Sequence, residues 1–220
     1  MRLIRVMCSG RVDLEFILRA FANGEDGVFI GGCKLDECNY VTHGNYDALA
    51  NTYMAKRILA HIGLNPDRLR IEFMSGADGN LLARYTDEFA KQIKEMGPLG
   101  IEQGMDREKV RFKLAAARNL VPFMRLAERE KLRVPVKSKQ AYNGFFDNPD
   151  TDRLFDSLFS DKLAVSQILL LLAEKPLSTS EISRQLGLNP SDVSRHMITS
   201  SRHGMVMYDT ASNCYSLARA

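Results

Sequence analysis

Three cysteines lie in loops that follow predicted strands. Cys33 and Cys38 lie in one loop after the run 27–30, and Cys8 follows the run 3–7. The C-x4-C spacing lets two sulfurs of one loop reach one metal centre, and it also occurs in the C-x4-C-x2-C run of plant-type ferredoxins. Cysteine patterns in intracellular chains favour metal binding or catalysis over disulfides. The sequence therefore presents a candidate metal or redox site.

Two interpretations of these cysteines are open on spacing alone. A buried cysteine often serves only as a small apolar side chain, and three thiols are one fewer than an iron–sulfur cluster normally takes. If the three thiols share a centre, we expect their sulfurs within about 7 Å of one another, as ligation to one or two irons requires. Cys214 is far away in the sequence and is expected to be structural.

Alternating apolar runs and amphipathic segments predict an α/β fold for residues 1–100. Strands are expected at 3–7, 27–30 and 69–74, and helices at 13–21, 46–62 and 80–96. This order predicts a small parallel sheet of the flavodoxin-like or Rossmann-like kind. Loops after successive parallel strands share one edge of the sheet, so the loops at 8–12, 31–45 and 75–80 should meet there.

Four polar side chains accompany the thiols as candidate cofactor-binding residues: Asn39, Tyr40, His43 and Asn45. Such groups can donate hydrogen bonds to cluster sulfurs and raise the reduction potential. His43 is alternatively a ligand of a Rieske-type centre, but such centres use a pair of histidines and no second one is nearby. The pair Gly31-Gly32 lacks the third glycine of a dinucleotide-binding loop, which argues against nucleotide binding.

Composition and charge narrow the class of protein. The chain has 220 residues, of which 45% are hydrophobic, enough for one large or two small domains. It has no apolar run near the roughly 20 residues that a membrane span needs and no visible signal peptide, so a cytoplasmic protein is expected. The net charge of +3 is uneven, because residues 101–140 alone carry an excess of +6.

Residues 101–160 predict a basic helix followed by a linker. The segment 105–131 alternates apolar and basic residues, and Pro122 should kink it or split it in two. Such a helix either packs against a core with a solvated face or serves as a docking arm for an acidic partner subunit. Residues 133–152 are polar and contain two prolines, which predicts a linker.

Residues 161–220 resemble a second, smaller domain of the winged-helix family, in particular its ArsR- and MarR-like members. The resemblance rests on a helix, a capping box from Ser178 to Glu181, a third helix over 190–203 and a hairpin over 206–217. The third helix offers polar and basic side chains that could reach DNA: Ser191, Ser194, Arg195 and Arg202. Residues 161–220, however, hold only 6 Lys and Arg against 5 Asp and Glu.

Four motifs in residues 1–100 form an ordered set. They are Ile4-Arg5-Val6-Met7-Cys8-Ser9-Gly10-Arg11-Val12-Asp13, Gly27-Val28-Phe29-Ile30-Gly31-Gly32-Cys33, Asp36-Glu37-Cys38-Asn39-Tyr40 and Gly44-Asn45-Tyr46. The set resembles the family of the delta subunit of methyl-viologen-reducing hydrogenase (the MvhD family). That resemblance implies a [2Fe-2S] cluster with Cys8, Cys33 and Cys38 as metal ligands. It also implies a subunit without catalysis of its own, which relays electrons between an oxidoreductase partner and a heterodisulfide reductase-like flavin/iron–sulfur subunit.

The sequence departs from that family at its start. Members of the family carry a further N-terminal strand with a C-x-x-C motif before the part that matches Leu3, whereas here Met1 stands two residues before it. The cluster is therefore expected to be incomplete in this chain, unless an upstream segment supplies further Cys or selenocysteine.

A redox-responsive winged-helix DNA-binding regulator is the alternative function. In that case the thiol-rich domain would act as a sensor joined to a DNA reader. Strong DNA binding needs several phosphate contacts from a basic face, and residues 161–220 are nearly neutral. Charge and the family resemblance therefore favour electron transfer, with nucleic acid an unlikely partner.

Overall fold

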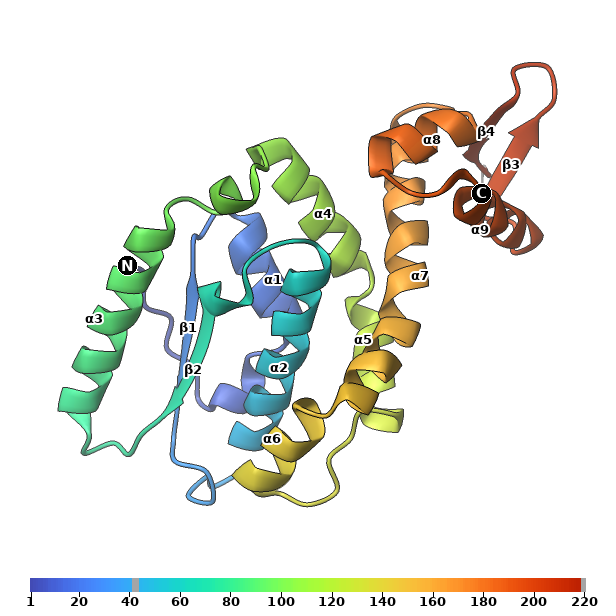
Figure 1. The fold of residues 1–220 in the computed structure, drawn as a ribbon. Coiled ribbons are helices and arrows are strands. Elements are labelled where there is room, and N and C mark those ends of the chain that lie inside the picture. The colour runs from blue at the N-terminus through green and yellow to red at the C-terminus, as the bar shows by residue number, and fades with distance from the viewer. Residues whose placement is uncertain (41–43, 219–220) are drawn as a thin grey trace. The chain divides into compact units, whose positions relative to one another are not determined.

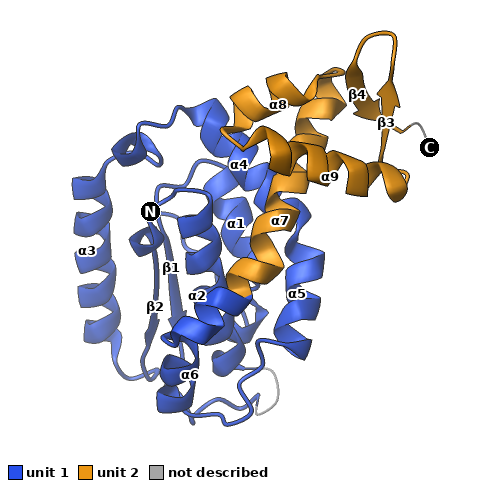
Figure 2. Cartoon of the chain, turned by 45° about the vertical axis from the view of Figure 1, so that its right-hand side comes forward, with its two compact units in different colours: residues 1–154 blue, residues 155–220 orange. Residues whose placement is uncertain are grey.

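The computed structural model describes residues 1–40 and 44–218, and the chain divides into two compact units, Met1–Leu154 and Phe155–Ala220 (Figures 1 and 2). Unit 1 contains η1 (Ser9–Arg11), α1 (Leu14–Ala22), β1 (Val28–Gly32), α2 (Asn45–His61), η2 (Pro66–Arg68), β2 (Leu69–Phe73), α3 (Gly79–Met96), η3 (Ile101–Gln103), α4 (Arg107–Asn119), α5 (Val121–Glu130) and α6 (Lys139–Phe146). Helix α7 (Pro149–Glu174) crosses the boundary between the units. None of the described helices is long and apolar enough to cross a membrane.

The sheet of unit 1 consists of two parallel strands within the described residues. β1 pairs with β2 in a register that sets Ile30 opposite Ile71. Successive side chains of a strand point to opposite faces. Phe29 contacts Phe89 of α3, with ring centroids 5.8 Å apart, whereas the neighbouring Ile30 is buried. Figure 1 accordingly shows α3 on one side of the sheet and α1 and α2 on the other.

The strand predicted at 3–7 is absent, and this prediction is wrong. Residues 1–6 have no regular structure, and the side chains of Leu3, Ile4 and Met7 are 86%, 83% and 89% exposed. A strand persists only where a neighbour satisfies its backbone groups, and this segment forms no ladder with β1. The α/β class of unit 1 is confirmed, but the Rossmann-like arrangement is not.

Helix α1 contributes one whole face to the core, and its sequence explains why. Asp13 caps its first turn by accepting a hydrogen bond from the Phe16 N–H at 3.0 Å, as the predicted start requires. The apolar face of the helix is fully buried: Leu14, Ile17, Leu18 and Phe21. This face packs against α2 and α4.

The predicted basic helix is split in two, as Pro122 required. Proline is tolerated in the first turn of a helix but not in its interior, so α4 ends before Leu120 and α5 begins beside the proline. Arg118 donates to Glu15 at 2.5 Å, and Arg125 forms an ion pair with Asp13. Both arginines therefore bind the start of α1, and the docking arm stays a prediction. The other interpretation, a packed helix with a solvated face, fits these contacts.

The segment predicted as a linker contains helix α6 and the first turn of α7. Tyr142 and Phe146 are four residues apart, so they share one face of α6, and both are buried. The ring of Tyr142 lies 5.0 Å from that of Tyr46, and the ring of Phe146 stacks 4.7 Å from that of Tyr53. This part of residues 133–152 therefore belongs to the core of unit 1 and supports α2.

Arg68 anchors α3 to the rest of unit 1. Its side chain is completely buried and donates to the carbonyl oxygens of Met96, Gly97 and Pro98 at 2.9 to 3.2 Å, where α3 ends. Its Nε also donates to Glu102 at 2.9 Å. The last carbonyl groups of a helix have no partner within it, so the guanidinium satisfies acceptors that would otherwise be buried alone.

Unit 2 has the winged helix-turn-helix order that the sequence predicted. It contains the later part of α7, α8 (Thr179–Leu186), α9 (Pro190–Arg202), β3 (Val206–Asp209) and β4 (Cys214–Leu217). The capping box of α8 is present in both directions, and Gly187 takes the left-handed conformation (φ 68°) that the turn needs. Apolar residues of all these elements except β4 form one buried cluster: Ile168, Leu172, Leu177, Ile182, Val193, Met197 and Val206.

Replacing Arg68 with methionine should destabilise unit 1 strongly. The change leaves Glu102 and four carbonyl oxygens, those of Asp26, Met96, Gly97 and Pro98, without their donor. Each buried polar group left without a partner costs about 1–3 kcal/mol. Arg84→Met on the exposed face of α3 is the matched control and should change the free energy of unfolding by less than about 0.5 kcal/mol. Hydrogen exchange of α3 in a urea series measures both, and equal effects of the two variants would contradict the anchoring role.

Candidate metal centre

The loops that follow the N-terminal segment, β1 and β2 meet at one end of the sheet, as the sequence predicted. Cys8 caps η1, Cys33 follows β1 directly, and Cys38 lies in the loop before α2. The Sγ atoms of Cys8 and Cys38 are 3.8 Å apart. From the third loop, Asp78 forms an ion pair with Lys34 at 3.2 Å.

Cys38 is the central thiol of the group. Its side chain interacts with those of both Cys8 and Cys33. A disulfide needs a sulfur–sulfur distance near 2.05 Å, so the separation of 3.8 Å describes two free thiols in contact. Among the described residues, no group of three or more His, Cys, Asp or Glu side chains is arranged to hold a metal ion. The structure thus brings the predicted thiols together without completing a site.

Asn45 fixes the first half of the thiol loop. Its side-chain amide is buried and donates to the carbonyl oxygens of Cys33 at 3.0 Å and Lys34 at 2.7 Å. The same amide nitrogen lies 3.6 Å from the sulfur of Cys33. One side chain at the start of α2 therefore holds both the backbone and the sulfur of Cys33.

Two further residues, missed by sequence reasoning, shape the middle of the loop. Asp36 takes a left-handed backbone conformation with φ 72°, which is uncommon outside glycine. The hydroxyl of Tyr46 donates to the Asp36 carboxylate at 2.7 Å and holds this turn. Burial, followed by the negative charge of Asp36, raises the pKa of Tyr46 to about 12, so the hydroxyl stays protonated as a donor. The sequence signal that could have identified Tyr46 is its place beside Asn45 in the motif Gly44-Asn45-Tyr46.

Gly44 allows α2 to begin directly against the thiols. A Cβ atom at this position would lie 2.6 Å from the Cys38 sulfur and 2.4 Å from the carbonyl oxygen of Tyr40. Both distances are shorter than real Cβ contacts, so any other residue would push Cys38 away. The backbone N–H groups at the start of α2 consequently stay close to this sulfur.

The three thiols differ in acidity. Burial raises the pKa of Cys8 and Cys33, and their contact with Cys38 adds to this effect. Burial also acts to raise the pKa of Cys38, but backbone N–H donors from Tyr40 and Asn45 outweigh it, and the pKa of Cys38 is lowered. A thiolate at a helix N-terminus gains from the same N–H groups and dipole. Cys38 is therefore the first of the three to become a thiolate.

Ser9 contributes a buried hydroxyl next to the thiols. Ser9 is 5% exposed, and its Oγ has no hydrogen-bond partner among the described residues. A buried polar group without a partner is costly, and it often marks the place of a group that binds there. Gly32 ends β1 beside this hydroxyl: any residue with a side chain at that position would place its Cβ atom 2.8 Å from the Ser9 Oγ.

The four predicted cofactor-binding residues have different positions. Asn45 is at the centre of the site, whereas the side chains of Asn39 and Tyr40 are exposed. Tyr40 acts at Cys38 through its backbone N–H. His43 lies outside the described residues. The roles of all four toward a cofactor stay predictions.

The chemical types of the side chains at this site suit an iron–sulfur cluster, but the site has fewer ligands than a cluster normally takes. Thiolates are the ligands of such clusters, and N–H and O–H donors to their sulfurs tune the potential. The site offers three thiols, several backbone N–H groups and the Ser9 hydroxyl without a partner. A fourth ligand is not present among these residues.

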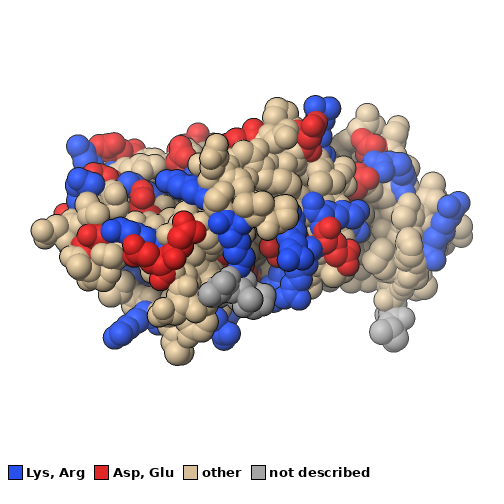
Figure 3. Space-filling view, turned by 90° about the horizontal axis from the view of Figure 1, so that it is seen from below, with Lys and Arg blue, Asp and Glu red and all other residues tan. Residues whose placement is uncertain are grey.

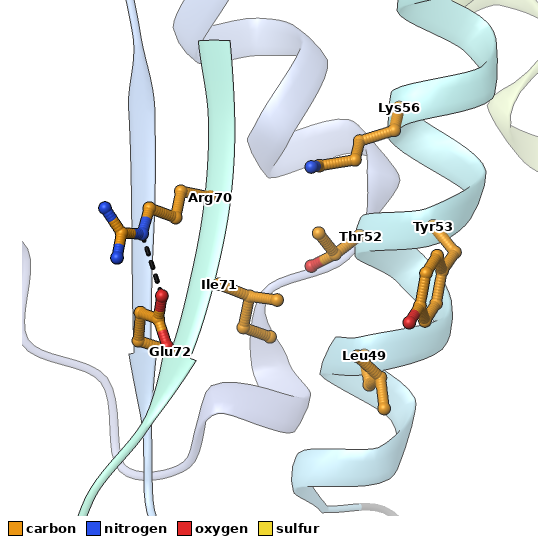
Figure 4. Close-up of a pocket in the computed structure, with 7 residues that line it drawn as sticks. All are labelled: Leu49, Thr52, Tyr53, Lys56, Arg70, Ile71 and Glu72. Atoms are coloured by element: carbon orange, nitrogen blue, oxygen red, sulfur yellow. Dashed lines mark hydrogen bonds and ion pairs between the residues drawn. The ribbon is translucent and has the colours of Figure 1, made fainter. Parts of the chain in front are cut away.

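A hollow of about 260 Å³ lies away from the thiols, between α2 and β2 (Figure 4). On one side, the guanidinium of Arg70 binds Glu72 at 2.8 Å and Glu88 at 3.3 Å, so its charge is already balanced. On the other side lie Leu49, Thr52, Tyr53 and Lys56. The lining has no cysteine or histidine and offers no nucleophile with an adjacent base, so the hollow does not indicate catalysis.

The surface around the β1–α2 loop carries no single-signed charge. In the view from below (Figure 3), Lys and Arg side chains alternate with Asp and Glu across the visible face. An extended basic patch is the electrostatic mark of nucleic-acid binding, and this face does not have one.

Comparison with known proteins places the thiol site within a known family. Residues 1–97 match the family described as methyl-viologen-reducing hydrogenase, delta subunit, and residues 164–197 match the bacterial regulatory protein, arsR family. An iron-sulfur subunit of the F420-non-reducing hydrogenase of Archaeoglobus profundus is 42% identical over 102 residues, which are 46% of this chain and 74% of that protein. Its counterpart from Methanococcus maripaludis is 40% identical over 97 residues, 44% of this chain and 72% of that protein.

Longer relatives carry the same domain as a small part of their length. A subunit of the ferredoxin/F(420)H(2)-dependent CoB-CoM heterodisulfide reductase of Methanosarcina acetivorans is 46% identical over 101 residues. These residues are 46% of this chain, but the chain spans only 13% of that relative.

In the metal-free chain, iodoacetamide should modify Cys38 at a lower pH than Cys8 or Cys33. The thiolate is the reactive species, and a lowered pKa means that it forms at lower pH, whereas the raised pKa values of the other two delay them. Peptide mass spectrometry across a pH series gives the order. The urea-denatured chain should lose this order, and earlier reaction of Cys8 or Cys33 in the folded chain would contradict the assigned electrostatics.

Proposed function

The chain belongs to the family of the delta subunit of methyl-viologen-reducing hydrogenase, and from this premise we propose that it is an electron-transfer subunit of an oxidoreductase complex. The observation that carries the proposal is the contact of the Cys38 thiol with those of Cys8 and Cys33. Cys33 and Cys38 lie 25 and 30 residues after Cys8 in the sequence, so only the fold unites the three.

Cys8, Cys33 and Cys38 are the residues that would hold an iron–sulfur cluster, of the [2Fe-2S] type. When bound, such a cluster takes up and passes on single electrons. The protein's own residues position and tune it: Asn45 holds Cys33, Gly44 lets α2 approach Cys38, and the pKa of Cys38 favours the thiolate that binds iron. The Ser9 hydroxyl provides a further donor at the site.

The partners proposed for this relay are an oxidoreductase subunit and a heterodisulfide reductase-like flavin/iron–sulfur subunit. The names of the relatives support this, since they describe subunits of hydrogenases and of heterodisulfide reductases.

Unit 2 is proposed to bind protein in that complex. Its winged-helix order and the match to the arsR family make DNA the competing partner. Arg195 on α9, the helix that would enter the major groove, binds Asp161 at 3.1 Å and Asp192 at 3.4 Å. A phosphate would have to compete with two carboxylates for this arginine, which favours a protein partner.

Cys33→Ser should remove the iron of one centre from the purified complex, because serine is a poor substitute for a thiolate ligand. Cys8→Ser and Cys38→Ser should have the same effect, and Cys214→Ser, in the wing of unit 2, should have none. Iron is measured per assembled complex, with circular dichroism as the test of folding. Unchanged iron in a folded Cys33→Ser complex would contradict the proposed function.

The full chain should bind duplex DNA no more tightly than the non-specific range, with Kd of about 1 μM or weaker at physiological salt. The reason is that residues 161–220 are nearly neutral and Arg195 is already paired. Fluorescence anisotropy with a random-sequence duplex pool, followed by selection from the pool, measures this. A nanomolar, steeply salt-dependent complex would contradict the proposal and favour the regulator.

A further inference from the structure

Strand β2 is paired along one edge only. On the side of β1, the N–H of Met74, the residue after β2, donates to the Gly32 carbonyl oxygen at 2.9 Å. Backbone groups of a parallel strand point alternately to its two edges, so those of Ile71 and Phe73 point away from β1. Among the described residues, no strand pairs with this second edge, and no backbone hydrogen bond from another segment reaches Ile71 or Phe73. The free edge of β2 therefore offers unused donors and acceptors.

The hollow between α2 and β2 lies along this free edge. Figure 4 shows the side chain of Ile71 pointing toward α2, whereas those of Arg70 and Glu72 point to the other face of the sheet. The lining residues of α2 share one face of that helix, at spacings of three and four residues: Leu49, Thr52, Tyr53 and Lys56. This stretch of helix spans about 10 Å, which is the length of about three residues of extended chain. The hollow is therefore long enough for a short extended segment.

Most polar groups of the lining already have partners. The hydroxyl groups of Thr52 and Tyr53 both donate hydrogen bonds within unit 1, at 2.8 and 2.6 Å. The charge of Arg70 is balanced by two glutamates. Apolar surface from Leu49 and Ile71 remains between these groups. Side chains of an added segment on this face would consequently meet apolar surface.

Lys56 is the exception in the lining. Its side chain is half-buried and points from α2 into the hollow (Figure 4). Among the described residues, its ammonium group has neither a hydrogen bond nor an ion pair, unlike the other two charged side chains of the lining. A partly desolvated cation gains from an opposite charge at close range. The hollow therefore selects an occupant with a carboxylate beside apolar side chains.

A second copy of this chain does not supply that carboxylate. The free backbone groups of β2 are those of its odd-numbered residues, so two copies paired at this edge would set odd positions opposite each other. Residues opposite each other point their side chains to the same face. The side chains of the second copy on the α2 face would be Leu69, Ile71 and Phe73, none of which is acidic.

We propose that a partner subunit docks in this hollow by adding an extended segment to the free edge of β2. An apolar side chain of that segment packs on Leu49 and Ile71, and an Asp or Glu binds Lys56. The unused backbone groups of Ile71 and Phe73 select an extended segment over a helix, which cannot pair with a strand edge. The inference deepens the proposed function, on which it rests for the existence of a complex, but the contact itself does not involve the thiols.

Hydrogen exchange tests the added strand, on the free chain and on the native complex isolated anaerobically through a tag on this chain. The amides of Ile71 and Phe73 should exchange at least tenfold more slowly in the complex. Unchanged exchange at both amides would overturn the inference. Protection of both amides in a complex without iron would support the docking site and remove the proposed function, whereas iron in a complex with unchanged exchange would do the reverse.

Carbodiimide cross-linking tests the occupant, because this reagent joins an amine to a carboxylate in direct contact. In the native complex, Lys56 should be joined to an Asp or Glu of a partner peptide that has apolar residues beside the acidic one. A link from Lys56 to this same chain or to a second copy of it would contradict the proposal. Lys56→Arg should keep the partner and abolish the link, since a guanidinium keeps the charge but does not react.

Two charge-reversed variants separate docking from folding. Lys56→Glu should reduce the partner retained by the tagged chain at least tenfold and leave the unfolding midpoint of the free chain in urea unchanged, because the ammonium group makes no contact within the described residues. Lys91→Glu, on an exposed position of α3, is the matched control and should change neither. Equal retention of the partner by the two variants would contradict a docking site at Lys56.

Discussion

The buried side-chain amide of Asn45 is the interaction on which the candidate centre depends. It holds the carbonyl oxygens of Cys33 and Lys34, and it touches the Cys33 sulfur. Because Asn45 is the first residue of α2, the loop position is tied to a helix that is packed on both α1 and α6. The glycine before it lets the same helix start against Cys38. Loop, helix and thiols are thus positioned as one body.

The rest of unit 1 shows how an α/β domain keeps such a loop in place with a very small sheet. Two parallel strands alone cannot bury enough apolar surface to be stable. The helices packed around the sheet bury the additional surface. Arg68 ties the end of α3 to the chain before β2, and Arg118 ties α4 to α1. Among the described residues, the other edge of β1 has no strand paired with it.

Periodicity in the sequence predicted α1, β1, α2, β2 and α3 and the end of the sheet at which the loops meet, because each side chain pattern matches one local conformation. Periodicity failed where the conformation of a segment depends on contacts with residues far away in the sequence. Residues 3–7 have strand composition but form no ladder with β1. Tyr142 and Phe146 lie in a polar segment but pack against Tyr46 and Tyr53 of α2. Burial of Arg68 and isolation of the Ser9 hydroxyl follow from three-dimensional contacts that no local pattern encodes.

Anomalous diffraction at the iron edge, from crystals of the assembled complex, tests the central claim most directly. The account predicts an iron peak within bonding distance of the sulfurs of Cys8, Cys33 and Cys38, with Asn45 still bound to the Cys33 carbonyl. A map without iron at these sulfurs, or with a disulfide between Cys8 and Cys38, would contradict it.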